Sequence, residues 1–261
     1  MEVVTKIMED NTKSRKSIWI VPISIIIAGA MVSTTLFFIK NGFSDKDQAT
    51  ILGMEDSLEK QQKLAMLARG VTNEDHILGN PNAPVKIIQY SDTECPYCKQ
   101  FMETMKKIMN IYGKKGEVAW VYRHLPGLEM HPKAQKEAEA IECAGELGGE
   151  DVFWKYVDRL MEVTPSHNNL DLALLPEIAE YAGLDRTQFE NCVESGKYKD
   201  KVTLDMEEGI KAGAIGTPFI IMITSRGERF PINGAEPYSV MKNAIDIALA
   251  HHTESENIDH K

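Results

Sequence analysis

The residues of this sequence that can do chemistry together are two cysteines, Cys95 and Cys98, in the segment SDTECPYCKQF. Two thiols separated by two residues can close a small disulfide ring, and can therefore exchange disulfides with the thiols of another molecule. They could instead supply half of a metal site, or be two buried and inert thiols. The elements that position them decide between these interpretations.

The cysteines lie between a predicted strand and a predicted helix. The apolar run VKIIQY at 85–90 is typical of a buried strand, and residues 96–112 place apolar side chains at helical spacing. Pro96 suits the first turn of that helix. EVAWVY at 117–122 predicts the next strand. The sequence thus indicates a βαβ unit with the pair at its strand-to-helix corner, the setting of a thioredoxin-like redox site.

The corner predicts different roles for the two thiols. Cys95 is expected at the exposed helix N-terminus, where unpaired N–H groups and the helix dipole lower the pKa of a thiol. It would attack a substrate disulfide, or be attacked when the pair is oxidised, and the more buried Cys98 would resolve the mixed disulfide. Pro96 offers no N–H, and carboxylates at Asp92 and Glu94 would raise the thiol pKa if close. The sequence leaves that balance open.

A metal site is disfavoured, because zinc needs four ligands and the other two cysteines are isolated. Inert thiols are disfavoured because Pro96 and the preceding SDTE place the pair at a loop-to-helix corner. We therefore expect no metal and no cofactor. Those other two cysteines are Cys143 and Cys192.

Composition limits the partners. The chain has 261 residues, of which 43% are hydrophobic, enough to bury a core. Its net charge is −10, which argues against nucleic acid, since no excess of Lys and Arg is available to neutralise phosphates.

The N-terminal part predicts a membrane anchor. Residues 18–39 form an uncharged run of 22, which as a helix rising about 1.5 Å per residue crosses a bilayer core of roughly 30 Å. A signal peptide cleaved after AGA at 28–30 is the alternative, but the apolar run continues past it. A buried core helix fits less well. Basic residues before the span favour a cytoplasmic segment 1–17 and an outer domain. They are Lys6, Lys13, Arg15 and Lys16, against Lys40 and Lys46 after it.

We therefore expect a single-pass protein of the inner or cytoplasmic membrane, embedded in the lipid bilayer by the apolar run, with a periplasmic or extracellular domain. Residues 40–74 are predicted to form a stalk. Its helix is a spacer or, as the less favoured alternative because its apolar stripe is interrupted, a partner-binding helix. The domain is expected at 75–251, with helical segments over about 131–213 and a return to strand at 217–223. The polar residues 252–261 are expected to be a disordered tail.

Five ordered segments resemble the DsbA-like thiol-disulfide oxidoreductases, most closely their membrane-anchored bacterial forms. The resemblance covers about 75–250 and rests on VKIIQYSDTECPYC, WVYRHLPG, HPKAQKEAEAIECAGELGGEDVFWKYVDRL, FENCVESGKY and GAIGTPFIIMI. It implies an α/β thioredoxin fold with a helical insertion between the βαβ unit and a cis-proline strand. It also implies reduced exported proteins as substrates and a membrane-embedded partner that reoxidises, or reduces, the cysteine pair.

The resemblance assigns roles to four further residues. It implies that Thr217-Pro218 is the cis-proline loop facing the redox cysteines, with the Thr217 backbone placed to pair with an extended substrate. Without the resemblance, a trans proline opening a strand would be expected. Cys143 and Cys192 match a structural disulfide of some anchored relatives, and the alternative is two buried free thiols.

The sequence departs from the strongly oxidising members at Tyr97, where they have histidine. A neutral phenol cannot stabilise a thiolate as an imidazolium can, so Glu94, Pro96 and Tyr97 are expected to modulate the site. An oxidase of exported proteins is favoured. A reductase or isomerase, and a non-catalytic metallochaperone or holdase on the same scaffold, remain alternatives.

Overall fold

The computed structural model describes residues 45–259, so the predicted cytoplasmic segment 1–17 and anchor 18–39 lie outside the described part of the chain. Within 45–259, no helix combines the length and the apolar character that a bilayer crossing requires. Helix α4 (Asp45–Ala65) occupies much of the predicted stalk. Contacts within the chain divide it between Gln62 and Lys63, and the second unit holds the sheet.

The sheet has five strands in the order β1-β3-β2-β4-β5. The central strands β2 and β3 are parallel and the other neighbours are antiparallel. A parallel pair needs a crossover, which helix α5 (Pro96–Ile111) provides, so the predicted βαβ unit is confirmed. The strands are β1 (His76–Gly79), β2 (Val85–Ser91), β3 (Val118–His124), β4 (Phe219–Ile223) and β5 (Arg229–Asn233).

The two edge strands are short. Strand β1 has four residues and was not predicted, since a run of four that includes His76 and ends in Gly79 gives no clear alternation. Strand β5 has five residues, and Pro231 stands at its centre opposite Ile221 of β4. Proline is tolerated in a sheet at such an edge position, because it has no N–H to give to a ladder.

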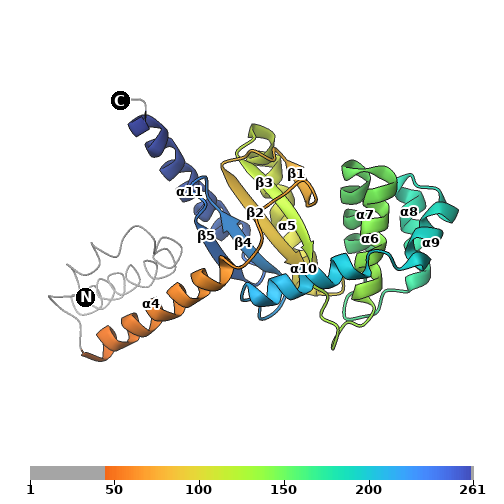
Figure 1. The fold of residues 1–261 in the computed structure, drawn as a ribbon, viewed down its shortest axis with the longest axis horizontal. Helices are drawn as coiled ribbons and strands as arrows, with labels where there is room; N and C mark the ends of the chain where they lie inside the picture. The colour runs from red at the N-terminus through yellow and green to blue at the C-terminus, as the bar shows by residue number, and fades with distance from the viewer. Residues whose placement is uncertain (1–44, 260–261) are drawn as a thin grey trace, which may run out of the picture. The chain divides into compact units, whose positions relative to one another are not determined.

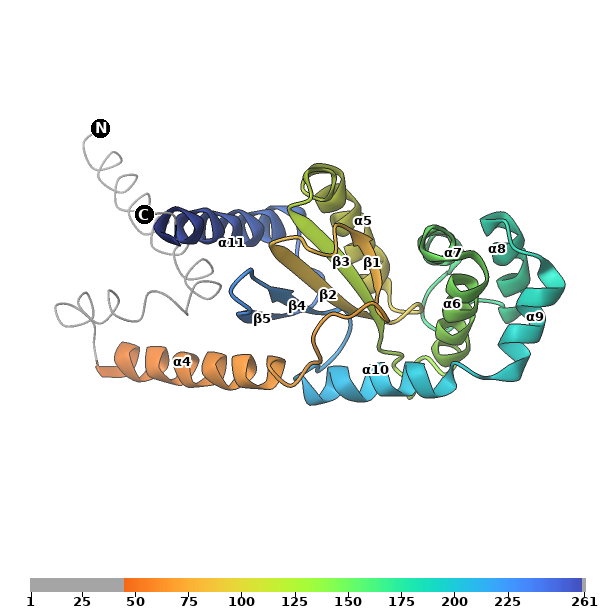
Figure 2. The same cartoon turned by 45° about the horizontal axis from the view of Figure 1, so that its top comes forward.

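Helices cover both faces of the sheet (Figures 1 and 2). Helix α5 packs on β3 and on α11 (Tyr238–Asp259), which also contacts β2, while α10 (Lys199–Lys211) lies on the opposite face against β2 and β3. At Gly209, α10 comes so close that a Cβ would lie 2.9 Å from the Tyr90 ring, which requires glycine there.

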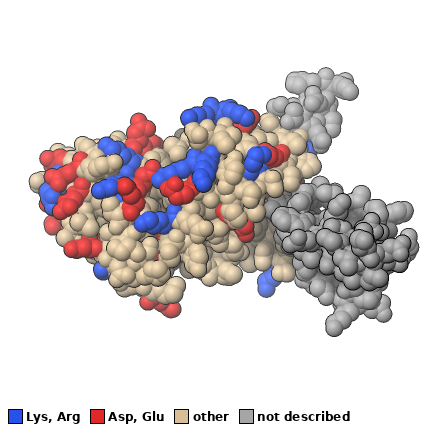
Figure 3. All heavy atoms as spheres, turned by 180° about the vertical axis from the view of Figure 1, so that it is seen from behind, with Lys and Arg blue, Asp and Glu red and all other residues tan. Residues whose placement is uncertain are grey.

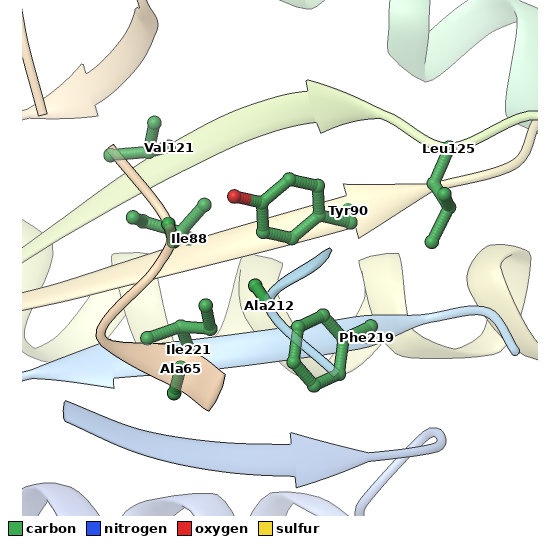
Figure 4. Packing of buried hydrophobic residues seen from close by; sticks show 9 residues of the cluster. Ala65, Ile88, Tyr90, Val121, Leu125, Ala212, Phe219 and Ile221 are labelled. Atoms are coloured by element: carbon green, nitrogen blue, oxygen red, sulfur yellow. The ribbon is translucent and has the colours of Figure 1, made fainter. Parts of the chain in front are cut away.

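The core between the sheet and α10 is closed by the last residue of α4 and by the segment just after it. Figure 4 shows Ala65 among the side chains of the central strands, and Ala68 is buried in the same cluster. Nearby, the buried Arg123 guanidinium binds Asp75 at 2.8 Å and Glu208 at 2.7 Å. The compact unit therefore begins earlier than the predicted boundary at residue 75.

A helical insertion separates β3 from β4, as the thioredoxin fold with an insertion requires. Helix α6 packs against α7 and α9, and α7 packs against α8. A disulfide between Cys143 and Cys192, 49 residues apart, joins α6 to α9. The new helices are α6 (Ala134–Gly148), α7 (Glu150–Val163), α8 (Leu175–Ala182) and α9 (Arg186–Ser195).

Two surface features bear on the sequence-based expectations. Helix α11 continues through Asp259, where a disordered tail from residue 252 was expected, because HHTESENID contains neither glycine nor proline to end it.

On the face seen in Figure 3, Lys and Arg side chains alternate with Asp and Glu side chains. Such mixed charge is typical of a solvated surface.

Candidate active site

Cys95 lies at the carboxyl end of β2, one residue before helix α5. Its backbone is extended, with φ −83° and ψ 120°, which makes it the N-cap residue of the helix. Its N–H donates to the Asp92 carbonyl at 3.2 Å. The side chain is only 6% exposed, less than the exposed corner that the sequence suggested, because Thr217 lies against it. The Cys95 Sγ donates to the Thr217 carbonyl oxygen at 3.3 Å.

Cys98 lies one turn further along α5 and is fully buried. The backbone N–H of Asp92 donates to its Sγ at 3.4 Å, so the second sulfur is held against the end of β2. Both cysteines of the pair are free thiols in the structure. The two thiols are thus arranged one behind the other, with the outer one alone reaching solvent.

The surroundings push the pKa values of the two thiols apart. A hydrogen bond from Cys98 is the largest cause lowering the Cys95 pKa to about 6, and hydrogen bonds from the Thr217 side chain and from the backbone of Cys98 and Tyr97 act in the same direction, against burial. Burial raises the pKa of Cys98 well above its usual 9.0, and the neighbouring Cys95 adds to it. At pH 7 about nine tenths of Cys95 is therefore thiolate, the form that attacks or leaves in disulfide exchange.

Thr217 and Pro218 are joined by a cis peptide bond, and β4 begins directly after them. The Thr217 carbonyl oxygen is the group that meets the Cys95 sulfur. The structure thus brings the two segments that the family resemblance connected to within a single hydrogen bond, across 122 residues of sequence.

Tyr97 is 62% exposed beside the buried pair. Its backbone N–H contributes to the lowered Cys95 pKa, whereas its phenol stands at the surface, where a partner can contact it. The absence of an imidazolium at this position does not leave the thiolate unsupported, because Cys98, Thr217 and backbone groups supply hydrogen bonds.

The Glu94 carboxylate is held by the loop that follows helix α7. Its Oε1 accepts from the Leu170 N–H at 2.8 Å, and its Oε2 accepts from the Asn169 N–H and the Thr164 hydroxyl, both at 3.3 Å. Three consecutive residues of this loop, Ser166 to Asn168, have φ between 59° and 64°. Successive N–H groups in such conformations form concave anion sites. The insertion is thereby attached to the residue that precedes Cys95.

Sequence reasoning named Asp92 as a nearby carboxylate, but it missed the partners of Asp92 and the whole of Glu137 behind this corner. The Asp92 carboxylate accepts from the N–H groups of Glu94 at 2.8 Å and Gly127 at 2.7 Å, and contacts His131 Nδ1 at 2.8 Å. Glu137 of α6 is fully buried and accepts from the Thr93 hydroxyl. Only the polar run SDTE before the cysteine pointed to such contacts, because the partners come from distant parts of the chain.

The four-cysteine zinc alternative is wrong for this structure, because Cys143 and Cys192 are bonded to each other in the insertion. Among residues 45–259, no group of three or more His, Cys, Asp or Glu side chains is arranged to hold a metal ion.

The fold is similar to that of solved bacterial proteins. DsbA2 of Pseudomonas aeruginosa matches with a TM-score of 0.57 and 26% identity, over 68% of this chain and 96% of that one. BdbD of Bacillus subtilis matches with a TM-score of 0.60 and 23% identity, over 67% of this chain and 93% of that one. α-DsbA1 of Wolbachia pipientis matches with a TM-score of 0.63 and 23% identity, over 71% of this chain and 96% of that one. The last two show the fold alone.

Curated relatives contain this domain as part of a longer chain. Na(+)/H(+) antiporter NhaA 3 of Salinispora tropica is 32% identical over 159 residues, 61% of this chain and 23% of the antiporter. NhaA 1 of Salinispora arenicola is 32% identical over 144 residues, which are 55% of this chain and 21% of that antiporter. This chain thus spans less than a quarter of these two relatives.

The thioredoxin family model matches residues 71–246, which include the whole sheet, the cysteine pair and the insertion. This match identifies the fold and the class of chemistry, together with the DsbA neighbours and with two thiols of different pKa beside a cis-proline loop. The chain belongs to the thioredoxin family and is a DsbA-like thiol-disulfide oxidoreductase.

Proposed function

We propose that this protein oxidises reduced exported proteins by donating a disulfide between Cys95 and Cys98. A substrate thiolate attacks the Cys95 sulfur, and the Cys98 sulfur leaves as a thiolate that takes up a proton from solvent, because its pKa is raised well above the usual value. A second substrate thiolate then attacks the mixed disulfide and releases Cys95 as a thiolate. The two electrons pass from the substrate to the pair, and a membrane-embedded partner reoxidises the pair.

One observation carries the oxidising direction. The Cys95 thiolate, with its pKa lowered to about 6, is stabilised relative to an ordinary thiol, so it is a good leaving group and favours the reduced form of the pair. A pair that is stable when reduced draws electrons from its substrates. A reductase would need a thiolate that is less strongly stabilised.

The same proposal includes export and anchoring through residues 18–39, with 40–74 as a spacer outside the membrane. The Cys143–Cys192 disulfide supports an oxidising compartment, since such bonds rarely persist in the cytosol. The antiporter relatives support membrane attachment, because an ion antiporter works within a bilayer and they contain a region similar to this domain. Accessibility of the domain to protease from outside intact cells tests this part.

The test of the redox role is gel-shift alkylation across defined glutathione buffers, with the parent and Cys95→Ser. The parent should show one two-electron transition and oxidise a reduced test protein, and Cys95→Ser should lose all such oxidation because the attacked sulfur is gone. Trapping the pair in living cells should find it mostly oxidised. A mostly reduced pair would replace the oxidase with a reductase or isomerase. Tight stoichiometric metal binding without exchange would favour a metallochaperone.

A further inference from the structure

A buried carboxyl group behind the active-site corner takes no part in the exchange described above. Glu137, on α6, is fully buried. Its Oε2 accepts a hydrogen bond from the Thr93 hydroxyl at 2.5 Å, whereas its Oε1 is buried without a hydrogen-bond partner. Thr93 is two residues before Cys95, so Glu137 contacts the segment that leads into α5. An unpartnered buried carboxylate oxygen is costly and requires an explanation.

The explanation is a second carboxyl group, Glu94. Both of its oxygens accept hydrogen bonds from donors, the N–H groups of Asn169 and Leu170 and the Thr164 hydroxyl, an arrangement that suits a carboxylate. Two neighbouring carboxyl groups cannot both ionise at low cost, so one keeps its proton. A proton on Glu137 Oε1 makes this atom a donor, which accounts for the lack of any donor directed at it, and the neighbouring Glu94 carboxylate is the acceptor that raises the Glu137 pKa through this hydrogen bond.

The charged and polar neighbours of Glu137 agree with this assignment. Burial, followed by Glu94 and Asp92, raises the pKa of Glu137 to about 8, while the Thr93 hydrogen bond acts in the opposite direction. Glu137 also raises the pKa of the buried hydroxyls of Tyr122 on β3 and Tyr156 on α7. The groups facing it from the loop before α5, from β3 and from α7 are thus carboxyls, hydroxyls and phenols.

The redox pair lies within reach of the same charge. Thr93, which donates to Glu137, directly follows Asp92, and Asp92 donates its N–H to the Cys98 Sγ at 3.4 Å and accepts from the Cys95 N–H at 3.2 Å. Negative charge on Cys98 and on Glu137 also raises the pKa of the buried Tyr122 hydroxyl. In a buried, poorly screened site, a nearby negative charge lowers the stability of a neighbouring anion.

We propose that Glu137 is a positioning residue of thiol exchange: as a neutral acid beside Glu94 it steadies the segment before Cys95, and when it ionises its charge disfavours the Cys95 thiolate relative to the disulfide. This inference rests on the proposed exchange at Cys95 and Cys98. It adds a carboxyl group from the helical insertion to a site otherwise built from the cysteine corner and the cis-proline loop.

The proton balance makes the effect measurable. Reduction of the pair by a dithiol breaks the Cys95–Cys98 bond, forms the substrate disulfide, and leaves a Cys95 thiolate, a Cys98 thiol and one proton. When Glu137 is already protonated, that proton goes to solvent. When Glu137 is ionised, the new thiolate draws part of the proton onto its carboxylate, so reduction and protonation are linked reciprocally.

The experiment measures the equilibrium constant with glutathione at about pH 6.5 and about pH 9 for the parent, Glu137→Gln and Glu139→Gln. Glu139 is a buried carboxylate of the same helix that binds Gln135 and Lys136 instead, so it is the matched control. Glu137→Gln should lie within about twofold of the parent at the lower pH and be about tenfold more oxidising at the higher pH, the factor for roughly one unit of coupling. Glu139→Gln should follow the parent at both.

The outcomes separate the two claims. Equal ratios of Glu137→Gln to parent at both pH values would overturn this inference alone, including the case in which a structural change shifts both equally. No exchange with glutathione in any of the three proteins would overturn the proposed function and this inference with it. If Glu137→Gln fails to fold, infrared titration of the buried carboxyl stretch in the parent decides. Its midpoint should be higher in the reduced protein, and identical midpoints would refute the assignment.

Discussion

The two cysteine pairs of this protein have nearly the same burial and opposite chemistry. Cys95 is 6% exposed and Cys192 is 8% exposed, while their partners Cys98 and Cys143 are at 0% and 1%. One pair consists of free thiols with separated pKa values, and the other is a disulfide that ties two helices together. Burial therefore does not set the reactivity of these sulfurs.

What differs is the set of groups around each pair. Cys95 stands at a helix start, where a neighbouring thiol and N–H groups hydrogen-bond to its sulfur and stabilise its thiolate. Cys143 and Cys192 lie within two packed helices, α6 and α9, and their bond closes a loop of 49 residues. A long loop restricts the unfolded chain, so this bond serves stability.

The sharpest test of this comparison is the pH dependence of alkylation. Cys95 should react with iodoacetamide half-maximally at about pH 6, as its lowered pKa requires, with about nine tenths thiolate at pH 7 against about 3% for an ordinary thiol. Cys98 should stay unlabelled below about pH 9, and the other two sulfurs should be unlabelled unless the protein is unfolded and reduced. Peptide mapping by mass spectrometry reads all four. A Cys95 midpoint near 8.5 would remove the distinction between the pairs.

Removing the second pair should separate stability from exchange. Cys143→Ser combined with Cys192→Ser should lower the free energy of unfolding by about 2–5 kcal/mol, measured by urea denaturation, because the unfolded chain is no longer cross-linked. The rate of disulfide exchange by the folded variant should equal that of the parent, since neither sulfur touches Cys95. A variant that is fully folded but slow in exchange would show that the structural pair also shapes the active site.

A smaller effect tests the ionic surroundings of the structural pair. His76 contacts Glu142, the residue before Cys143, at 3.2 Å and Glu150 at 2.7 Å. Burial lowers the pKa of His76, but the hydrogen bonds with Glu142 and Glu150 outweigh it and leave the pKa raised. The resulting stability is present below about pH 6.5 and is lost as the pH rises through the folded pKa. His76→Gln should therefore lose roughly 1 kcal/mol more at about pH 5.5 than at about pH 8.5, measured by urea denaturation of variant and parent. An equal loss at both pH values would contradict a role for the charged imidazole.

The parts of the fold that could be predicted are those encoded by neighbouring residues. The strand at 85–90, the helix from Pro96 and the next strand follow from apolar periodicity and from proline at the first helical turn, and the structure confirms all three. The helical segments over about 131–213 were predicted from their periodicity, and the family resemblance implied that they form an insertion, which is present. Strand β1 has too few residues to show the alternation of apolar and polar side chains by which a strand is recognised.

The features that could not be predicted depend on contacts between distant residues. Cys95 is less exposed than its place at a helix start suggests, because Thr217 covers it from 122 residues away. The sequence left open whether Glu94 lies close enough to oppose the thiolate, and the structure shows its carboxylate bound by a loop 70 to 76 residues further on. Thr93 meets Glu137 across 44 residues. Periodicity and propensity describe local structure, and they cannot report which side chains a tertiary fold brings together.

The two edges of the sheet have a consequence for a protein whose proposed clients are unfolded polypeptides. A long free edge would template the addition of extended chains, the first step of aggregation. Here β1 offers only four residues, and the proline at the centre of β5 removes one backbone donor. A protein with such edges can bind unfolded chains repeatedly without adding them to its sheet.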